Sequence, residues 1–100
     1  MANLTRPVHR LTDYSSGHDA CPPRPLMTAS EDVFVNSRGC SRLNDLYHVH
    51  SCSAHPPHYD YIREASNTVF VNSRPIGRLY DPLWMYGYAA EASDDVFSGD

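Results

Sequence analysis

The chain of 100 residues contains no lysine, and its eight arginines are dispersed instead of clustered. The formal net charge is −4, whereas a nucleic-acid-binding surface is normally basic. No apolar run approaches the 18 residues of a membrane-spanning helix, and the opening MANLTRPVHR lacks the apolar segment of a secretory signal. These absences argue against a nucleic-acid partner and against a helical membrane anchor.

Segments rich in helix-forming residues are also missing. Eight prolines, five glycines and seven tyrosines favour turns and short strands over helices. A chain of this length predicts a single domain, residues 1–100. Such a domain buries only about 60 to 65% of its unfolded surface, so its hydrophobic core is marginal.

Cysteine is scarce, and its count of three is odd. An odd count excludes a disulfide framework that uses every cysteine. Six histidines accompany the three cysteines, and a small domain with a marginal core often depends on a bound metal. This combination points to a metal as the stabilising element.

The most informative feature is an internal repeat. VFVNSRGCSRLND at 33–45 returns as VFVNSRPIGRLYD at 69–81, with nine of thirteen positions identical. Two shorter patterns each occur three times: Arg-Leu-x-Asp from Arg10, Arg42 and Arg78, and Ala-Ser-x-x-Val-Phe from Ala29, Ala65 and Ala92. Repeats of this kind determine the architecture.

The third unit is divided between the two ends of the chain. Residues 92–98 begin a unit, and residues 7–13 complete one. We therefore expect the ends to meet and close three equivalent units around a pseudo-threefold axis. VFVNSR and the residues after it predict a β-hairpin, so the expected fold is all-β with little or no helix. One helical turn over 83–90 is the minor alternative.

The segments Pro7–Arg10, Gly39–Arg42 and Pro75–Arg78 resemble the Pro-Ala-Ala-Arg signature of the PAAR-repeat family. The loop GHDACPPRP, 17–25, is similar to the first loop of such proteins from contractile-tailed phages. The resemblance covers roughly residues 7 to 98. It implies a small conical fold that is stabilised by one metal ion near its vertex, usually zinc, with iron as the alternative. Here Thr-Asp, Asn-Asp and Tyr-Asp replace the Gly-Asp of the family.

The resemblance also implies a function. The protein would cap a trimeric β-helical spike, one cap per trimer, and contact the target cell envelope transiently. It would belong to the virion, at the phage tail tip or baseplate, or be secreted through a type VI secretion system, where it could carry effectors as an adaptor. This role needs no enzymatic activity. The alternative from another class, a small zinc enzyme, would need an open metal site beside a base such as Glu64.

The repeat supplies candidate ligands without the family. His18 and His50 each lie five residues after the Asp of Arg-Leu-x-Asp, and Tyr86 occupies that position in the third unit. Cys21 lies twelve residues before Val33, and His58 eleven before Val69. His18, Cys21, His50 and His58 form a set of three imidazoles and one thiolate, which suits tetrahedral zinc. Four protein ligands make the predicted site structural.

Other candidates stay open at this point. His55-x-x-His58 is plausible ligand spacing, so His55 could displace His50, and Cys52 is a fifth candidate. Cys40 is expected to pack as a small apolar residue, and His9 to be structural or exposed. The repeated aspartates are expected to accept hydrogen bonds from turn amides. The remaining aromatics favour core packing over a sugar-binding patch: Tyr59, Tyr61, Trp84, Tyr86 and Tyr88.

The predicted site makes metal removal a test of stability. A closed structural zinc site supplies roughly 10 kcal/mol or more of folding free energy at neutral pH, which exceeds the net stability expected of so small a core. We expect a chelator to unfold the domain, as followed by circular dichroism during thermal melting. A metal-stripped protein with an unchanged melting temperature would contradict this prediction.

Overall fold

The computed structural model describes residues 5–53 and 55–100, and within these ranges the regular structure consists of short β-strands without a helix. The strands are β1 Arg6–Pro7, β2 Phe34–Val35, β3 Arg38–Gly39, β4 His50–Cys52, β5 His55–His58, β6 Phe70–Val71, β7 Arg74–Pro75 and β8 Phe97–Ser98. None of the described segments forms a helix that could cross a membrane. The all-β prediction is confirmed, and the alternative of a helical turn over 83–90 is wrong.

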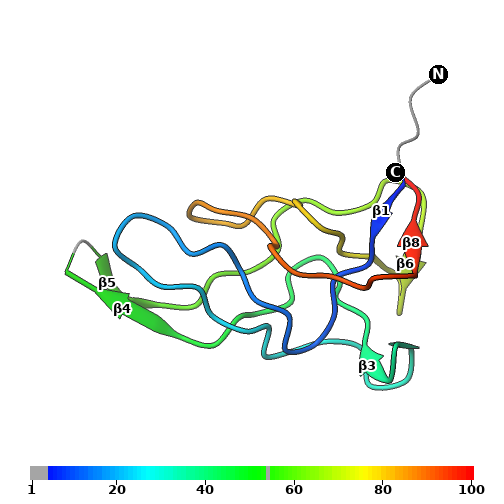
Figure 1. Ribbon diagram of the computed structural model, residues 1–100, viewed down its shortest axis with the longest axis horizontal. Coiled ribbons are helices and arrows are strands. Elements are labelled where there is room, and N and C mark those ends of the chain that lie inside the picture. Colours follow the sequence, from blue (N-terminus) through cyan, green and yellow to red (C-terminus); the bar gives the residue numbers. More distant parts are fainter. Residues whose placement is uncertain (1–4, 54) are drawn as a thin grey trace.

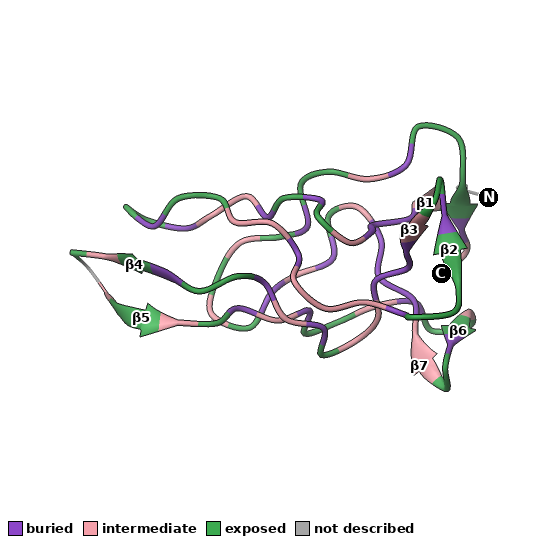
Figure 2. Ribbon diagram, turned by 90° about the horizontal axis from the view of Figure 1, so that it is seen from below, coloured by how far each residue is buried: buried purple, intermediate pink, exposed green. Residues whose placement is uncertain are grey.

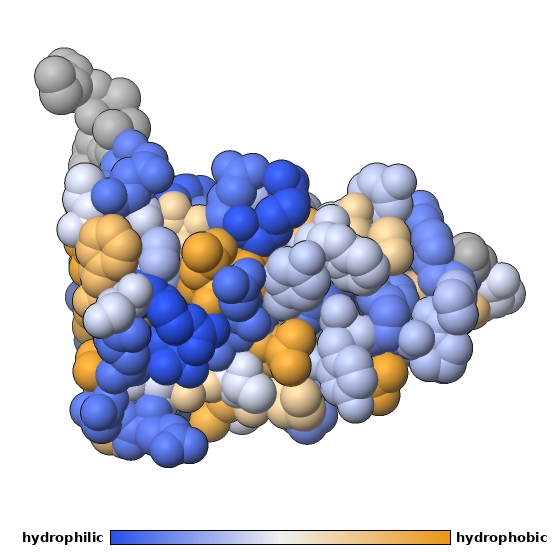
Figure 3. Space-filling model, turned by 180° about the vertical axis from the view of Figure 1, so that it is seen from behind, coloured by the Kyte–Doolittle hydropathy of each residue, from blue (hydrophilic) through white to orange (hydrophobic). Residues whose placement is uncertain are grey.

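The molecule is tapered, with extents of 41 × 32 × 23 Å. The pairs β1–β8, β2–β3 and β6–β7 lie at the broad end, and the pair β4–β5 lies at the narrow end (Figures 1 and 2). A view from behind shows the same taper, with a narrow end covered mainly by hydrophilic side chains (Figure 3). The expected conical shape is therefore present.

The repeated VFVNSR segments form hairpins because their central residues accept a left-handed backbone. Asn36 and Ser37 have φ values of 54° and 66°, and Asn72 and Ser73 have 54° and 64°. Two consecutive residues with positive φ define a type I′ turn, whose twist matches that of the flanking strands. The antiparallel pairs β2–β3 and β6–β7 follow directly, as the repeat predicted.

The third hairpin-like pair is assembled from the two ends of the chain. β1 pairs antiparallel with β8, in the register Arg6 with Ser98 and Pro7 with Phe97. The C-terminus accordingly lies beside β1 (Figure 1). The predicted closure of the three units is confirmed, and it takes the place of the turn that the other two units contain.

A ring of three backbone hydrogen bonds joins the units at the pseudo-threefold axis. The amide of His9 donates to the carbonyl of Gly77 (3.1 Å), that of Ser41 to His9 (3.0 Å), and that of Gly77 to Ser41 (2.9 Å). These residues occupy equivalent repeat positions but differ greatly in size. All three are buried, so one large, one small and one absent side chain share the space on the axis.

Each unit also contains an Arg–Asp pair whose aspartate is buried. In the first unit, Arg10 donates through its amide and Nε to Asp13 Oδ2 (2.9 Å each) and through Nη2 to Oδ1 (3.1 Å). Equivalent contacts join Arg42 to Asp45 and Arg78 to Asp81. The repeated aspartates thus accept hydrogen bonds from turn amides, as predicted. A second arginine reaches each carboxylate from a hairpin strand: Arg38, Arg74 and Arg6.

The buried apolar side chains form two hydrophobic clusters. The cluster toward the broad end contains Val8, Val35, Cys40, Val71 and Ile76, so Cys40 packs as a small apolar residue. The second cluster contains Leu26, Tyr47, Ile62 and Leu83. His9 is fully buried and contacts Tyr47 of the second cluster, and burial lowers the pKa of His9. Its Nδ1 donates to the carbonyl of Glu91 (2.6 Å), so its Nε2 accepts from the Tyr47 hydroxyl (2.7 Å).

The exposed aromatic side chains correct one prediction. Tyr59, Trp84, Tyr86 and Tyr88 are exposed to between 44 and 62%, so they are not core residues. The rings of Tyr61 and Trp84 stack on each other at 5.6 Å. The core is filled instead by Tyr47, the small residue Cys40 and aliphatic side chains.

The crowded axis gives a test of the closed ring. A Cβ atom at Gly77 would overlap the Ser41 hydroxyl oxygen and lie 3.0 Å from Ile62 Cδ1. We expect Gly77→Ala to lower the free energy of unfolding by about 1–3 kcal/mol, as measured by denaturant titration. Adding Ser41→Gly should restore part of this loss, because it removes the side chain that blocks the new methyl group.

Gly99→Ala is the matched control. The nearest atom to its added Cβ is Thr68 Oγ1, at 3.8 Å, so its stability should stay close to that of the wild type. Equal stabilities for the Gly77→Ala and Gly99→Ala proteins would show that the axis is less tightly packed than described.

Candidate metal centre

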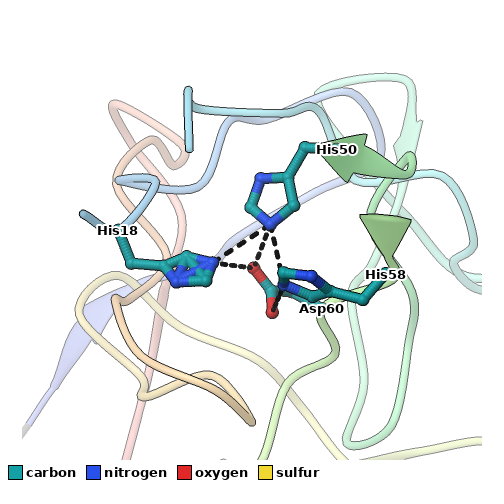
Figure 4. Close-up of side chains that lie close together, drawn as sticks. All are labelled: His18, His50, His58 and Asp60. Carbon is teal, nitrogen blue, oxygen red and sulfur yellow. Dashed lines mark hydrogen bonds and ion pairs between the residues drawn. The ribbon is translucent and has the colours of Figure 1, made fainter. Parts of the chain in front are cut away.

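Three histidines and one aspartate converge near the narrow end (Figure 4). His18 comes from the first connecting loop, His50 begins β4, His58 ends β5, and Asp60 follows two residues later. The Nε2 atom of His50 lies 3.1 Å from that of His18 and 2.9 Å from that of His58. These four groups could hold a metal ion.

The spacing of the four groups is near that of ligands around one metal ion. Ligands at 2.0–2.1 Å from zinc are separated from one another by about 3.3 Å along each edge of the tetrahedron. Asp60 Oδ2 lies 3.3 Å from His50 Nε2 and 3.7 Å from His18 Nε2, and Asp60 Oδ1 lies 3.3 Å from His58 Nε2. These distances and the two imidazole contacts range from 2.9 to 3.7 Å, so the four groups lie close enough together to share one ion.

Hydrogen bonds at the far side of two rings set the tautomer that metal binding requires. His50 Nδ1 lies 3.1 Å from the Pro22 carbonyl, and His58 Nδ1 lies 3.0 Å from the Pro56 carbonyl. A carbonyl only accepts, so in each ring Nδ1 carries the proton and donates it. The neutral ring then has its lone pair on Nε2, which faces the centre of the cluster. Such outer contacts commonly orient metal-binding histidines.

Burial makes a bound cation favourable here. The Asp60 side chain is 3% exposed, and its Oδ1 has no hydrogen-bond partner among the described residues. A buried carboxylate needs a compensating charge. Burial also lowers the pKa of His18, which favours the neutral ring that ligates metal. A divalent cation among these groups would compensate the carboxylate and use the three lone pairs.

The structure brings three of the four predicted ligands together. His18, His50 and His58 lie in the cluster, whereas Cys21 forms a disulfide with Cys52. In this disulfide form Cys21 offers no thiolate, so its role as a ligand stays a prediction for the reduced protein. Asp60 was missed, because neither equivalent repeat position, Arg24 or Gly87, carries an acid. The one feature of the sequence that points to Asp60 as a ligand is its position two residues after His58.

His55, the alternative to His50 as a ligand, lies outside the central cluster. His55 Nε2 contacts Asp19 Oδ2 at 2.8 Å, and these two residues form a second group with His18. The rings of His18 and His55 are stacked, with an interplanar angle of 19°. An ion must lie near the plane of each ring that binds it, so stacked rings are poorly arranged to share one. His50, and not His55, therefore joins the central cluster.

The third loop covers the cluster with aromatic rings. Tyr86 lies 6.0 Å from His18, and Trp84 lies 6.2 Å from His58, measured between ring centroids. These residues take the positions in the third unit that would correspond to ligands in the other two. The centre thus takes its ligands from two units and part of its cover from the third.

No protein-family model matches the chain, and a search of curated proteins found no match.

The position of Asp60 yields a test by metal binding. We expect Asp60→Asn to weaken zinc binding, because a neutral amide replaces the anionic ligand. Loss of a residue that only contacts a ligand weakens metal binding roughly 10- to 100-fold, and loss of a ligand should cost at least as much. Calorimetric titration of the disulfide-bonded protein measures this change. His48→Asn alters an exposed histidine of the same segment and should bind zinc as the wild type does. Unchanged affinity in Asp60→Asn would remove Asp60 from the site.

Proposed function

We propose that this protein is the tip of a contractile injection machine, where it caps a trimeric β-helical spike and sharpens it for passage through a cell envelope. One observation carries the proposal: a single chain presents nearly the same apolar side chain three times around one end. Phe34, Phe70 and Phe97 are exposed to 59, 57 and 55%. They lie in β2, β6 and β8, at the broad end (Figures 1 and 2).

Three equivalent exposed phenylalanines match a partner with true threefold symmetry. Exposed apolar side chains that recur in a regular arrangement mark interaction surfaces, and aromatic anchors supply much of the binding energy of protein interfaces. A trimer offers three identical receptors, and one pseudo-threefold chain can fill all three. The short strands beside the phenylalanines could also extend the strands of the spike by edge pairing.

The narrow end has the properties of a rigid point. It contains the candidate metal centre and the Cys21–Cys52 disulfide, and both connect the first and second loops. Zinc is the ion we assign to it, because three imidazoles and one anionic ligand suit tetrahedral zinc; iron is the alternative. At the narrow end, where the taper leaves no room for a hydrophobic core, the disulfide and the bound metal would hold the loops together instead.

The enzyme alternative has less support. Glu64, the candidate base, forms an exposed ion pair with Arg63 and lines a cavity together with Arg78 and Asp100. The histidine cluster lines no part of that cavity. The proposed tip role needs no enzymatic activity. The tip would belong to a phage tail or to the spike of a type VI secretion system.

The stoichiometry of the complex tests the proposal. The protein is mixed with the trimeric spike encoded by its neighbouring gene, and the mass of the complex is measured by light scattering. We expect one chain per trimer. Failure to bind any trimeric spike, or a ratio of three chains per trimer, would contradict the proposal.

Single substitutions of the three phenylalanines refine the test. Each change to Ser should weaken spike binding by about tenfold or more, since burying one such side chain is worth roughly 1.5–3 kcal/mol. The three effects should be similar, because the positions are equivalent. Tyr14→Ser, which alters an exposed aromatic side chain outside these strands, is the control and should bind normally.

A further inference from the structure

The disulfide at the narrow end is built into the same strand pairs as the metal-binding histidines. Cys21 pairs with His18 through two backbone hydrogen bonds, of 3.1 and 2.8 Å. Cys52 follows His50 by two residues in β4 and pairs with His55 of β5. The bond joins loops that are separated by 31 residues, with the two Cα atoms 5.0 Å apart. The two cysteines and the metal-binding histidines therefore lie in the same short strand pairs.

Two different anionic ligands compete for one place. Three histidines fill three positions of a tetrahedral ion, so only one position is left. The repeat pattern selects Cys21 for it, whereas the structure places the Asp60 carboxylate there. While Cys21 is joined to Cys52 it cannot be this ligand, because a sulfur in a disulfide is not the thiolate that binds metal.

We propose that Cys21 and Cys52 form a reversible redox pair that selects the fourth metal ligand. When the disulfide is formed, Asp60 completes a site of three histidines and one carboxylate. When the disulfide is reduced, the Cys21 thiolate takes that position, because zinc favours a soft thiolate over a carboxylate. Asp60 then remains beside the ion as an uncoordinated countercharge.

The redox step balances with ordinary cellular thiols. Two molecules of a thiol such as glutathione supply two electrons and two protons to the disulfide and become one oxidised glutathione, which leaves two cysteine thiols. Cys21 then releases its proton to solvent as its sulfur binds the metal. Oxidised glutathione drives the reverse reaction by thiol–disulfide exchange: the protein disulfide re-forms, and two molecules of glutathione are released.

Cys21 is the better placed of the two sulfurs. Its residue is 3% exposed, whereas Cys52 is only partly buried. Cys21 also lies directly opposite His18 in the backbone pairing, whereas Cys52 lies opposite His55, outside the central cluster. The third cysteine, Cys40, is a buried free thiol in the cluster toward the broad end, so it takes no part in the exchange.

The biological setting of this exchange rests on the proposed function. A tip is assembled in the reducing cytosol and is then driven outside, where disulfides persist. A site that can hold its ion with either ligand would keep the point cross-linked on both sides of the envelope. The chemistry itself depends only on the metal centre.

Cobalt substitution tests the proposal, because a cobalt–thiolate bond has its own absorption. The full chain is loaded with Co²⁺ under reducing conditions and again after treatment with oxidised glutathione, and free thiols are counted in each state. We expect tetrahedral visible bands in both states. A near-ultraviolet charge-transfer band should appear only in the reduced protein.

Three variants assign the ligands. Cys52→Ser cannot form the disulfide, so it should show the charge-transfer band in both conditions. Cys21→Ser should lack the band in both conditions and still bind cobalt. Asp60→Asn should bind cobalt normally when reduced and at least tenfold more weakly when oxidised. If Cys21→Ser fails to fold, the wild type and Cys52→Ser still decide the question.

Several results would overturn the proposal. Cobalt bound without a charge-transfer band in the reduced wild type would exclude the thiolate. Loss of cobalt on oxidation would exclude Asp60 as the replacement ligand. Loss of the charge-transfer band in Cys52→Ser would show that Cys52, and not Cys21, binds the metal. None of these outcomes affects the ratio of one chain per spike trimer, so failure of the redox proposal and failure of the tip role are distinguishable.

Discussion

The ring of backbone hydrogen bonds among His9, Ser41 and Gly77 is the contact on which the rest of the fold depends. Most of the strands contain only two residues, and an isolated pair of such strands is not stable in water. The ring joins each unit to the next and so makes the three short hairpin-like pairs cooperative. It also requires the chain ends to meet, since the third unit is completed by β1 and β8.

The Arg–Asp pairs make this closed arrangement specific. Each aspartate holds the amide and the guanidinium of its own turn and receives a second arginine from a hairpin strand. Charges buried in this way add little net stability when they are well paired, but removal of one partner is costly. A wrongly registered unit would leave a buried aspartate unpaired, so the pairs favour a single alignment of the three units.

The symmetry fails toward the narrow end, and the chemistry found there explains why it can. The taper leaves too little space for a hydrophobic cluster, and polar side chains fill the end instead. His18, His50, His58 and Asp60 come from two units, while the third supplies Trp84 and Tyr86 as cover. Four groups from two loops are enough to surround one ion, so the third loop need not supply a ligand. The broad end, by contrast, keeps its three equivalent phenylalanines.

The sequence by itself determined the features that repeat. The thirteen-residue repeat predicted the two hairpins, and the shorter patterns that occur three times predicted the closure of the ends and the role of the aspartates. Each of these features depends on contacts within one unit or between equivalent ones. Recurrence also identified His18 and His50. Only the tertiary structure decided the features that occur once: Asp60 in the cluster, Cys21 joined to Cys52, and the exposure of the third-loop aromatics. These depend on where loops of unequal length bring side chains in space, which no repeated pattern records.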